Sequence, residues 1–158
     1  MKSTGIVRRI DDLGRIVIPK EIRRNLHIKE NEEVEIFIDN EYILLRKFSR
    51  LLCLEDVSKK IIDIVCGLIN KTVIISDKEK YIYGCGVDKK KYLNENISDK
   101  LVDAFSNRNV FYIDNMLSYP IICNGDVMGL VIFVGEYNEN DVSIIKLVAQ
   151  FLGKYVEE

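Results

Sequence analysis

The pattern of apolar and polar positions changes near residue 50. Before that point, short β-branched runs are interrupted by turn residues, a pattern typical of small hairpins. Strands are expected at 5–10, 15–18, 34–38 and 42–47, with turns at 11–14 and 39–41. A short helix is expected from Pro19 to Leu26, because proline at a helix start sacrifices no hydrogen bond. Its i, i+4 pair Ile22 and Leu26 should face inward, which leaves Arg23 and Arg24 in solvent.

The second part of the chain mixes helical spacing with strand-like runs. Apolar residues at every fourth position from Val57 to Ile69 predict an amphipathic helix over 55–69, and Ser98 suits the N-cap of a helix ending at Asn107. Strands are expected at 72–76, 81–85 and 110–113, a hairpin at 119–123 and 127–134, and a final helix at 139–156. This order predicts an α+β fold with an antiparallel sheet flanked by helices.

Composition supports a folded protein with two small domains. The chain has 158 residues, 47% of them hydrophobic, and no apolar run approaches the ~20 residues that span a bilayer. The opening MKSTGIVRR lacks the apolar core of a signal peptide, so we expect a cytoplasmic protein without a membrane partner. The domains are expected at 1–50 and 54–158, joined by the short stretch Phe48-Ser49-Arg50.

Charge separates the two parts more sharply. The first 29 residues carry eight basic and three acidic side chains, a net +5, while the whole chain carries −2 and the remainder therefore −7. Five of the eight basic residues are arginines, whose planar fork suits phosphate oxygens and guanine edges. This concentration at one end of an acidic chain favours binding to a polyanion, although basic clusters on ordinary solvated surfaces are also common.

The side chains capable of catalysis or metal binding are few. His27 is the one histidine, and it closes the short helix. None of Cys53, Cys66, Cys85 and Cys123 forms a CxxC pair, so neither a metal centre nor a cofactor is expected and the thiols are interpreted as buried and structural. No nucleophile elbow, P-loop or dinucleotide loop occurs, so no catalytic residue is assigned and the chain is not expected to be an enzyme.

Residues 1 to about 50 carry a specific resemblance. The segments TGIVRRIDDLGRIVIPKEIRR and EIFIDNEYILLRK resemble, in order and spacing, the DNA-binding module of the AbrB family of transition-state regulators. The segments KKYLNENIS, YPIICNGDVMGLVIF and AQFLGKYVEE resemble the GAF-like C-terminal domain of the sporulation (SpoVT) branch of that family. In that branch the segment before the YPIICNGD strand is longer than the stretch from about Asp114 to Ser118 here, so no ligand-binding residue is named.

The resemblance implies a DNA-binding regulator of sporulation-type transcription. In the family, two chains interleave as a swapped-hairpin β-barrel that binds A·T-rich double-stranded DNA, which fits readout of groove shape. The implied DNA contacts are Arg8, Arg15, Arg23 and Arg24, with Arg9 and Lys2 as secondary candidates. The residues implied at the subunit interface are Ile6, Ile16, Ile18, Ile22, Val34, Ile36 and Leu44. A nucleoid location, in the forespore, is implied as well.

Assembly beyond the dimer is suggested by the long helices. In the final helix Ile144, Val148, Phe151 and Tyr155 form one stripe, and a second stripe of Ile145, Leu152 and Val156 lies beside it. One stripe is enough to pack a helix on a sheet. Either both stripes are buried within one domain, or the helices pair with copies in another chain. We favour the second interpretation, which makes the closed assembly a tetramer.

Two other functions remain open. An antitoxin would share the AbrB-like module, but antitoxins of this kind usually end in a short disordered tail, and about 100 apolar, patterned residues follow here. A GAF-type thiol redox enzyme would use Cys85 or Cys123, and neither cysteine has a visible basic partner in the sequence.

Overall fold

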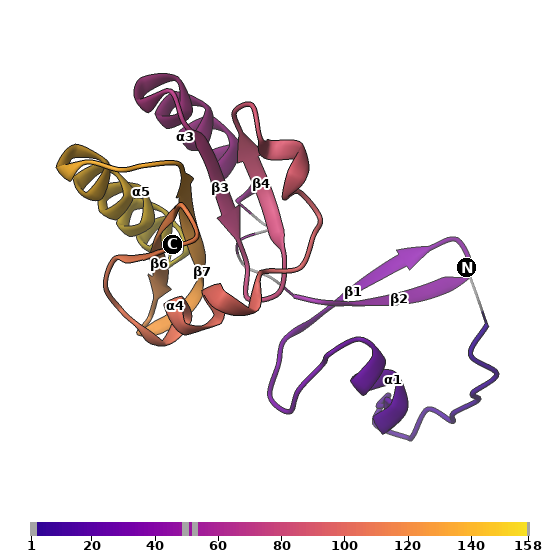
Figure 1. Ribbon diagram of the computed structural model, residues 1–158. Helices are drawn as coiled ribbons and strands as arrows, with labels where there is room; N and C mark the ends of the chain where they lie inside the picture. Colours follow the sequence, from indigo (N-terminus) through magenta and orange to yellow (C-terminus); the bar gives the residue numbers. More distant parts are fainter. Residues whose placement is uncertain (1–2, 49–50, 52–53, 158) are drawn as a thin grey trace. The chain divides into compact units, whose positions relative to one another are not determined.

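The computed structural model describes residues 3–48, 51 and 54–157, and it divides into two compact units, 1–48 and 49–158 (Figure 1). The first unit contains the helix α1 (Lys20–Asn25) and an antiparallel hairpin of β1 (Val34–Asp39) and β2 (Tyr42–Lys47). Asp39 pairs with Tyr42 across the turn, where Asn40 adopts a φ of 51°. The second predicted hairpin and the short helix are therefore confirmed.

The first predicted hairpin is wrong for the single chain. Its turn forms, because the Gly14 N–H donates to the Asp11 carbonyl and the Asp11 N–H donates to the Arg15 carbonyl, at 3.0 and 3.1 Å. The two arms, 5–10 and 15–18, have no strand structure. An isolated two-stranded hairpin is marginal in water. Here the arms expose Val7, Ile10 and Val17, so they lack the covering surface that would stabilise them.

The first unit has almost no core of its own. Among residues 3–48, Ile28 is the one apolar side chain that is buried. Leu26, expected to face inward, is 49% exposed, because no other part of the unit lies over this side of the short helix. The large apolar side chains that are exposed in this unit are Val7, Ile10, Leu13, Ile16, Val17, Leu26, Ile36, Ile38, Tyr42 and Ile43. A unit of this size gains little stability from so little apolar burial.

The second unit is a five-stranded antiparallel sheet with helices on both faces. Its strands are β3 (Thr72–Ser76), β4 (Tyr81–Cys85), β5 (Phe111–Ile113), β6 (Met116–Cys123) and β7 (Asp126–Val134), in the spatial order β4-β3-β7-β6-β5. Its helices are α3 (Glu55–Ile69), α4 (Val102–Ser106) and α5 (Glu139–Glu157), with two 3₁₀ turns, η1 (Lys89–Lys91) and η2 (Asp99–Leu101). The predicted α+β class and flanked antiparallel sheet are confirmed.

Alternation along the strands builds two separate cores. In β3, Val73 and Ile75 face α3 and α5, whereas Ile74 faces the opposite side, where Leu101 and Ala104 pack (Figure 1). Helix α5 approaches β6 closely at Gly153, where a Cβ atom would stand 2.2 Å from the Ile122 carbonyl oxygen. A side chain at this position would push the helix off the sheet.

Two local predictions for this unit need correction, and one further element was missed. The helix expected over 98–107 is split into η2 and the shorter α4, and Ser98 precedes η2 without a side-chain cap. The connection expected from Asp114 to Ser118 is only the two-residue turn Asp114-Asn115, because both residues adopt positive φ and allow a tight hairpin. The turn η1 was not expected. Within the described part of the chain, no helix is long and apolar enough to cross a membrane.

The final helix carries three stripes rather than the two expected. Ile145, Val148, Ala149 and Leu152 are buried against the sheet. A polar stripe of Ser143, Lys146, Gln150 and Lys154 is exposed. Between these stripes the apolar side chains of Leu147, Phe151 and Tyr155 are also exposed. Val148 thus belongs to the core, whereas Phe151 and Tyr155 do not, because the sheet covers only one side of the helix.

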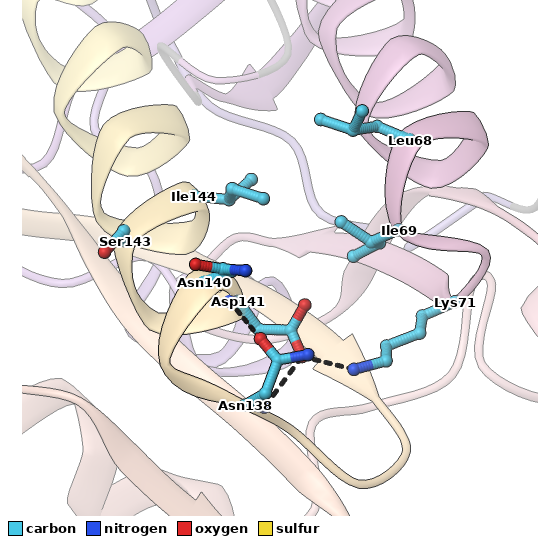
Figure 2. Close-up of a pocket in the computed structure, with 8 residues that line it drawn as sticks. All are labelled: Leu68, Ile69, Lys71, Asn138, Asn140, Asp141, Ser143 and Ile144. Carbon is cyan, nitrogen blue, oxygen red and sulfur yellow. Dashed lines mark hydrogen bonds and ion pairs between the residues drawn. The ribbon is translucent and has the colours of Figure 1, made fainter.

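Helices α3 and α5 are joined at one end by an ion pair, which Figure 2 shows below a shallow hollow. Lys71, just after α3, pairs with the Asp141 carboxylate, whose side chain is 4% exposed. Asp141 and Asn138 also form a reciprocal cap at the start of α5, since each side chain accepts a hydrogen bond from the other's N–H, at 2.9 and 3.0 Å. Asp141 therefore fixes the start of α5 against the end of α3.

Replacing Asp141 with alanine is expected to destabilise the second unit by about 2–4 kcal/mol, because it removes a helix cap and leaves a partly buried ammonium unpaired. Urea unfolding followed by circular dichroism measures the change. Glu139→Ala is the matched control, because Glu139 lies in the same first turn but is exposed, and it should cost less than ~0.5 kcal/mol. Equal effects of the two variants would contradict the assigned role of Asp141.

Candidate nucleic-acid interface

Arg15 is held by the turn that precedes it. The Asp11 carboxylate accepts hydrogen bonds from the backbone N–H groups of Leu13 and Arg15, at 3.0 and 2.7 Å, and from the Arg15 Nε at 2.8 Å. Arg15 remains largely exposed, so its outer guanidinium nitrogens face solvent. The sequence reasoning did not assign Asp11 a role. The sequence feature that points to this role is an aspartate at the start of the D-D-L-G-R turn. An aspartate side chain in this position commonly accepts a hydrogen bond from the backbone N–H two residues later.

Asp11 also gives this turn a pH dependence. The backbone N–H of Arg15 and then its side chain stabilise the carboxylate, so the pKa of Asp11 is lowered from its ordinary value of 3.8. A lowered pKa in the folded state means that the carboxylate contributes its full stabilisation above that ordinary value. The contribution is lost as the pH falls through the lowered value. The turn should therefore be intact at neutral pH and loosen only in strong acid.

Arg23 and Arg24 lie in the last turn of α1, which ends in a Schellman motif. The Ile28 N–H donates to the Arg23 carbonyl at 2.8 Å, and the His27 N–H donates to the Arg24 carbonyl at 3.1 Å. His27 adopts the left-handed conformation, with a φ of 52°, and Ile28 is buried beside it. This motif fixes the helix end, and the role of His27 as the helix terminator is confirmed.

The two arginines differ in exposure. Arg24 is exposed, as expected. Arg23 is half-buried, and its Nε atom is shielded from solvent without a hydrogen-bond partner. The prediction that Arg23 faces solvent freely is therefore wrong, because part of its side chain is covered in the folded unit. A shielded donor without a partner is costly, so the Nε of Arg23 lowers the stability of the single chain.

Arg8 lies in the first arm, opposite the start of α1. Residues 5–8 and Pro19, Lys20 and Glu21 line one hollow of about 480 Å³, which brings Arg8 near Lys20. Lys20 is exposed and was not assigned a site role, although its place after Pro19 in a basic segment marks it as a candidate. Arg9 is exposed, and Lys2 lies outside the described residues. The single chain places Arg8, Arg9, Arg15 and Arg24 in solvent, and of these arginines the hollow beside α1 is lined by Arg8 alone.

The described side chains of the second unit include an apolar sheet face and three free cysteines. The sheet face opposite α3 and α5 is filled by apolar side chains, including Tyr81, Leu101 and Ile132. No cluster of three His, Cys, Asp or Glu side chains within the described ranges could hold a metal ion. Cys66 and Cys123 are buried free thiols and Cys85 is partly exposed, while Cys53 lies outside the described residues.

Comparisons with known proteins follow the same division of the chain. Residues 53–157 match the family described as "Stage V sporulation protein T C-terminal, transcription factor", and residues 7–49 match "Antidote-toxin recognition MazE, bacterial antitoxin". Over 178 aligned positions the chain is 40% identical to stage V sporulation protein T of Bacillus subtilis strain 168, with all of both chains covered. Over 48 residues it is 58% identical to the transition state regulatory protein AbrB of the same organism, which covers 30% of this chain and 50% of that protein.

The second unit also has a likeness among solved structures. The cyanobacteriochrome receptor PixJ matches with a TM-score of 0.57 and 11% identity, over 70% of this chain and 99% of that one, which supports a shared fold alone. The fold and the basic module together define a two-part protein in which an AbrB-like segment precedes a GAF-like α+β domain. The chain belongs to the stage V sporulation protein T family.

Proposed function

We propose that this protein is a DNA-binding regulator of sporulation transcription, with residues 1–50 as its DNA-binding domain and 54–158 as its regulatory and oligomerisation domain. The observation that carries the proposal is the identity over the whole chain with stage V sporulation protein T. The arginines of the first unit, of which Arg8, Arg9, Arg15 and Arg24 are exposed, support it independently, since they suit a polyanion. A location on the cytoplasmic nucleoid of the forespore follows from this role.

The proposed DNA contacts are Arg8, Arg15, Arg23 and Arg24, supplemented by Arg9 and Lys2. Arg15 and Arg24 are exposed on ordered turns, so they can reach phosphates without much loss of side-chain freedom. Arg23 is half-buried and its Nε is shielded, so its contact with DNA would be made by its other guanidinium nitrogens. With few rigid base-reading elements, preference for A·T-rich duplexes would come from groove width and deformability.

The first unit is proposed to work as an interleaved dimer. Its exposed apolar side chains and unpaired arms need a covering surface, and a second copy provides both apolar contacts and strand partners. All seven apolar residues implied at the subunit interface keep solvent-accessible surface that a second copy could bury. Two are exposed in the single chain, Ile16 and Ile36, and five are half-buried: Ile6, Ile18, Ile22, Val34 and Leu44. The paired module would double the number of arginines available to one duplex.

A second candidate function is an antitoxin, favoured by the match of residues 7–49 to the MazE antitoxin family. The described part of residues 54–157 forms a sheet with two cores, whereas a toxin-wrapping tail gains its structure only on binding. A regulatory function therefore explains both units of the chain, whereas an antitoxin function explains only the first unit.

Binding of the full-length protein to DNA is expected to be strongly salt-dependent. Four arginines per chain give eight per dimer, so the slope of log affinity against log salt should be about −7, at ~0.9 for each neutralised phosphate. Fluorescence anisotropy with A·T-rich and G·C-rich duplexes of about 30 base pairs measures both the slope and the preference. A slope near zero, or no binding at low salt, would overturn the proposed function.

Substitution of Asp11 tests whether the hydrogen-bonded turn must hold Arg15 in place for DNA binding. Simple electrostatics predicts that removal of either Asp11 or Asp12 tightens DNA binding, because each change removes a negative charge. We expect Asp11→Ala instead to weaken binding by about threefold to tenfold, because three hydrogen bonds that order the turn are lost. The matched control, Asp12→Ala, should bind as well as or better than the unmodified protein in the same anisotropy assay. Tighter binding by both variants would show that Asp11 does not position Arg15.

A further inference from the structure

The hollow between the first arm and the start of α1 presents two cations to solvent. It has a volume of about 480 Å³, and its lining consists of residues 5–8, Pro19, Lys20 and Glu21. Arg8 and Lys20 are both exposed, and they reach the hollow from different segments of the chain. Glu21 is the one acidic side chain among these lining residues, so two cations and one carboxylate give the hollow a net charge of +1.

The backbone at Lys20 is fixed by the way α1 begins. Lys20 is the first residue of the helix and follows Pro19, which has a φ of −57° and a ψ of 147°. The Pro19 carbonyl accepts a hydrogen bond from the Arg23 N–H at 3.0 Å, which closes the first turn of the helix. Because the proline ring restricts φ and the turn is hydrogen-bonded, only the side chain of Lys20 must become ordered when an anion binds.

The two cations have no anionic partner within their own unit. Among the described residues, neither Arg8 nor Lys20 forms an ion pair, and the Arg8 Nη1 donates to the neighbouring Val7 carbonyl at 3.3 Å. Arg15, by contrast, is paired with Asp11. Two like charges that line one hollow repel each other, and an anion bound by both replaces this repulsion with attraction. The hollow therefore suits a small anionic group that contacts both side chains.

We propose that Arg8 and Lys20 hold one phosphate of the DNA backbone between them, with one such site on each chain. This inference rests on the proposed DNA-binding function, to which it adds Lys20 as a contact that shares its phosphate with Arg8. The guanidinium fork can bind two oxygens of a phosphate, and the lysine ammonium acts as a point charge beside it. A phosphate contact positions the protein on the duplex without reading its sequence. Lys20 should therefore contribute equally to the binding of A·T-rich and G·C-rich duplexes.

The salt dependence of binding distinguishes one shared phosphate from two separate ones. The slope of log affinity against log salt counts neutralised phosphates, at ~0.9 for each. If the phosphate is shared, Arg8 still neutralises it in Lys20→Ala, so the slope should change by less than ~0.5. The affinity of this variant should fall about threefold to tenfold, because a dimer loses two exposed charge contacts. The Arg8→Ala, Lys20→Ala double variant loses the phosphate on both chains, so its slope should be about 2 shallower.

The test uses the full-length protein and fluorescence anisotropy with A·T-rich and G·C-rich duplexes over a range of salt concentrations. It compares the unmodified protein with Arg8→Ala, Lys20→Ala and the double variant. Lys29→Ala is the matched control, because Lys29 is an exposed lysine of the same basic segment that does not line the hollow. This control should retain most of the affinity, and Lys20→Arg, which keeps the positive charge, should bind like the unmodified protein. Circular dichroism checks that each variant is folded.

Three results would overturn the inference alone. Equal losses of affinity in Lys20→Ala and Lys29→Ala would show that Lys20 contributes only its general charge. A slope about 2 shallower in Lys20→Ala alone would show that Lys20 neutralises a phosphate of its own. A loss of affinity confined to one of the two duplexes would show that Lys20 contacts bases. By contrast, a failure of the unmodified protein to bind either duplex would overturn the proposed function, and the inference with it.

Discussion

Replacing Arg15 with alanine is expected to lower DNA affinity at least tenfold at moderate salt. Each arginine contact to a phosphate or guanine edge contributes about 1–3 kcal/mol, and a dimer loses two of them. The salt slope should shrink by about 2 as well, since two phosphates are no longer neutralised. The fold should be intact, because Arg15 is largely exposed and its stabilising partner, Asp11, can retain its backbone hydrogen bonds.

The matched control is Arg108→Ala, which removes an exposed arginine from the second unit and lowers the net charge by the same amount. Arg108 donates to the Gly125 carbonyl, at 2.9 Å, and it lies outside the basic segment. If binding depends on overall charge, the two variants should weaken it equally. If binding depends on the proposed DNA contacts, Arg108→Ala should bind DNA almost normally. Wild-type affinity in Arg15→Ala would show that Arg15 does not belong to the interface.

Local signals were sufficient to predict much of the second unit. Helix α3 and strands β3 and β4 begin and end where the spacing of Val57, Ile61 and Val65 and the β-branched run of Thr72–Ser76 indicate. The Asn124-Gly125 turn has positive φ at both residues, as a tight hairpin requires. These elements are stabilised by contacts between residues that are close in sequence or that lie in one sheet. Hydrophobic periodicity and turn residues are therefore enough to predict them.

The remaining features depend on contacts that a pattern along one chain does not contain. The arms 5–10 and 15–18 have strand-like residues, yet they lack a partner strand within the chain. Arg23 lies on the polar side of its helix in the sequence pattern, but in the structure it is half-buried and its Nε is shielded.

The exposed apolar surface of α3 and α5 is the strongest support for assembly beyond the dimer. Ile64 and Leu68 on α3 are 67% and 69% exposed, and Leu147 on α5 is 67% exposed. These stripes adjoin a hollow of about 500 Å³ lined by Leu68, Ile69 and Ile144, which Figure 2 shows between the two helices. Contiguous apolar surface of this kind usually marks an interface. A second pair of the same helices would cover it as a four-helix bundle and, with the proposed N-terminal dimer, produce a closed tetramer.

Leu147→Asp is therefore expected to convert a tetramer into a dimer that still binds DNA. Leu147 is exposed in the single chain, so an aspartate there should leave the fold intact, but in a helical bundle it would be a buried, unpaired carboxylate. Light scattering at micromolar concentration should show the mass reduced by half. Gln150→Asp introduces the same charge on the exposed polar stripe of α5 and should leave the tetramer intact. If the unmodified protein already scatters as a dimer, the helices do not form a bundle, and the apolar stripes must serve a partner other than this chain.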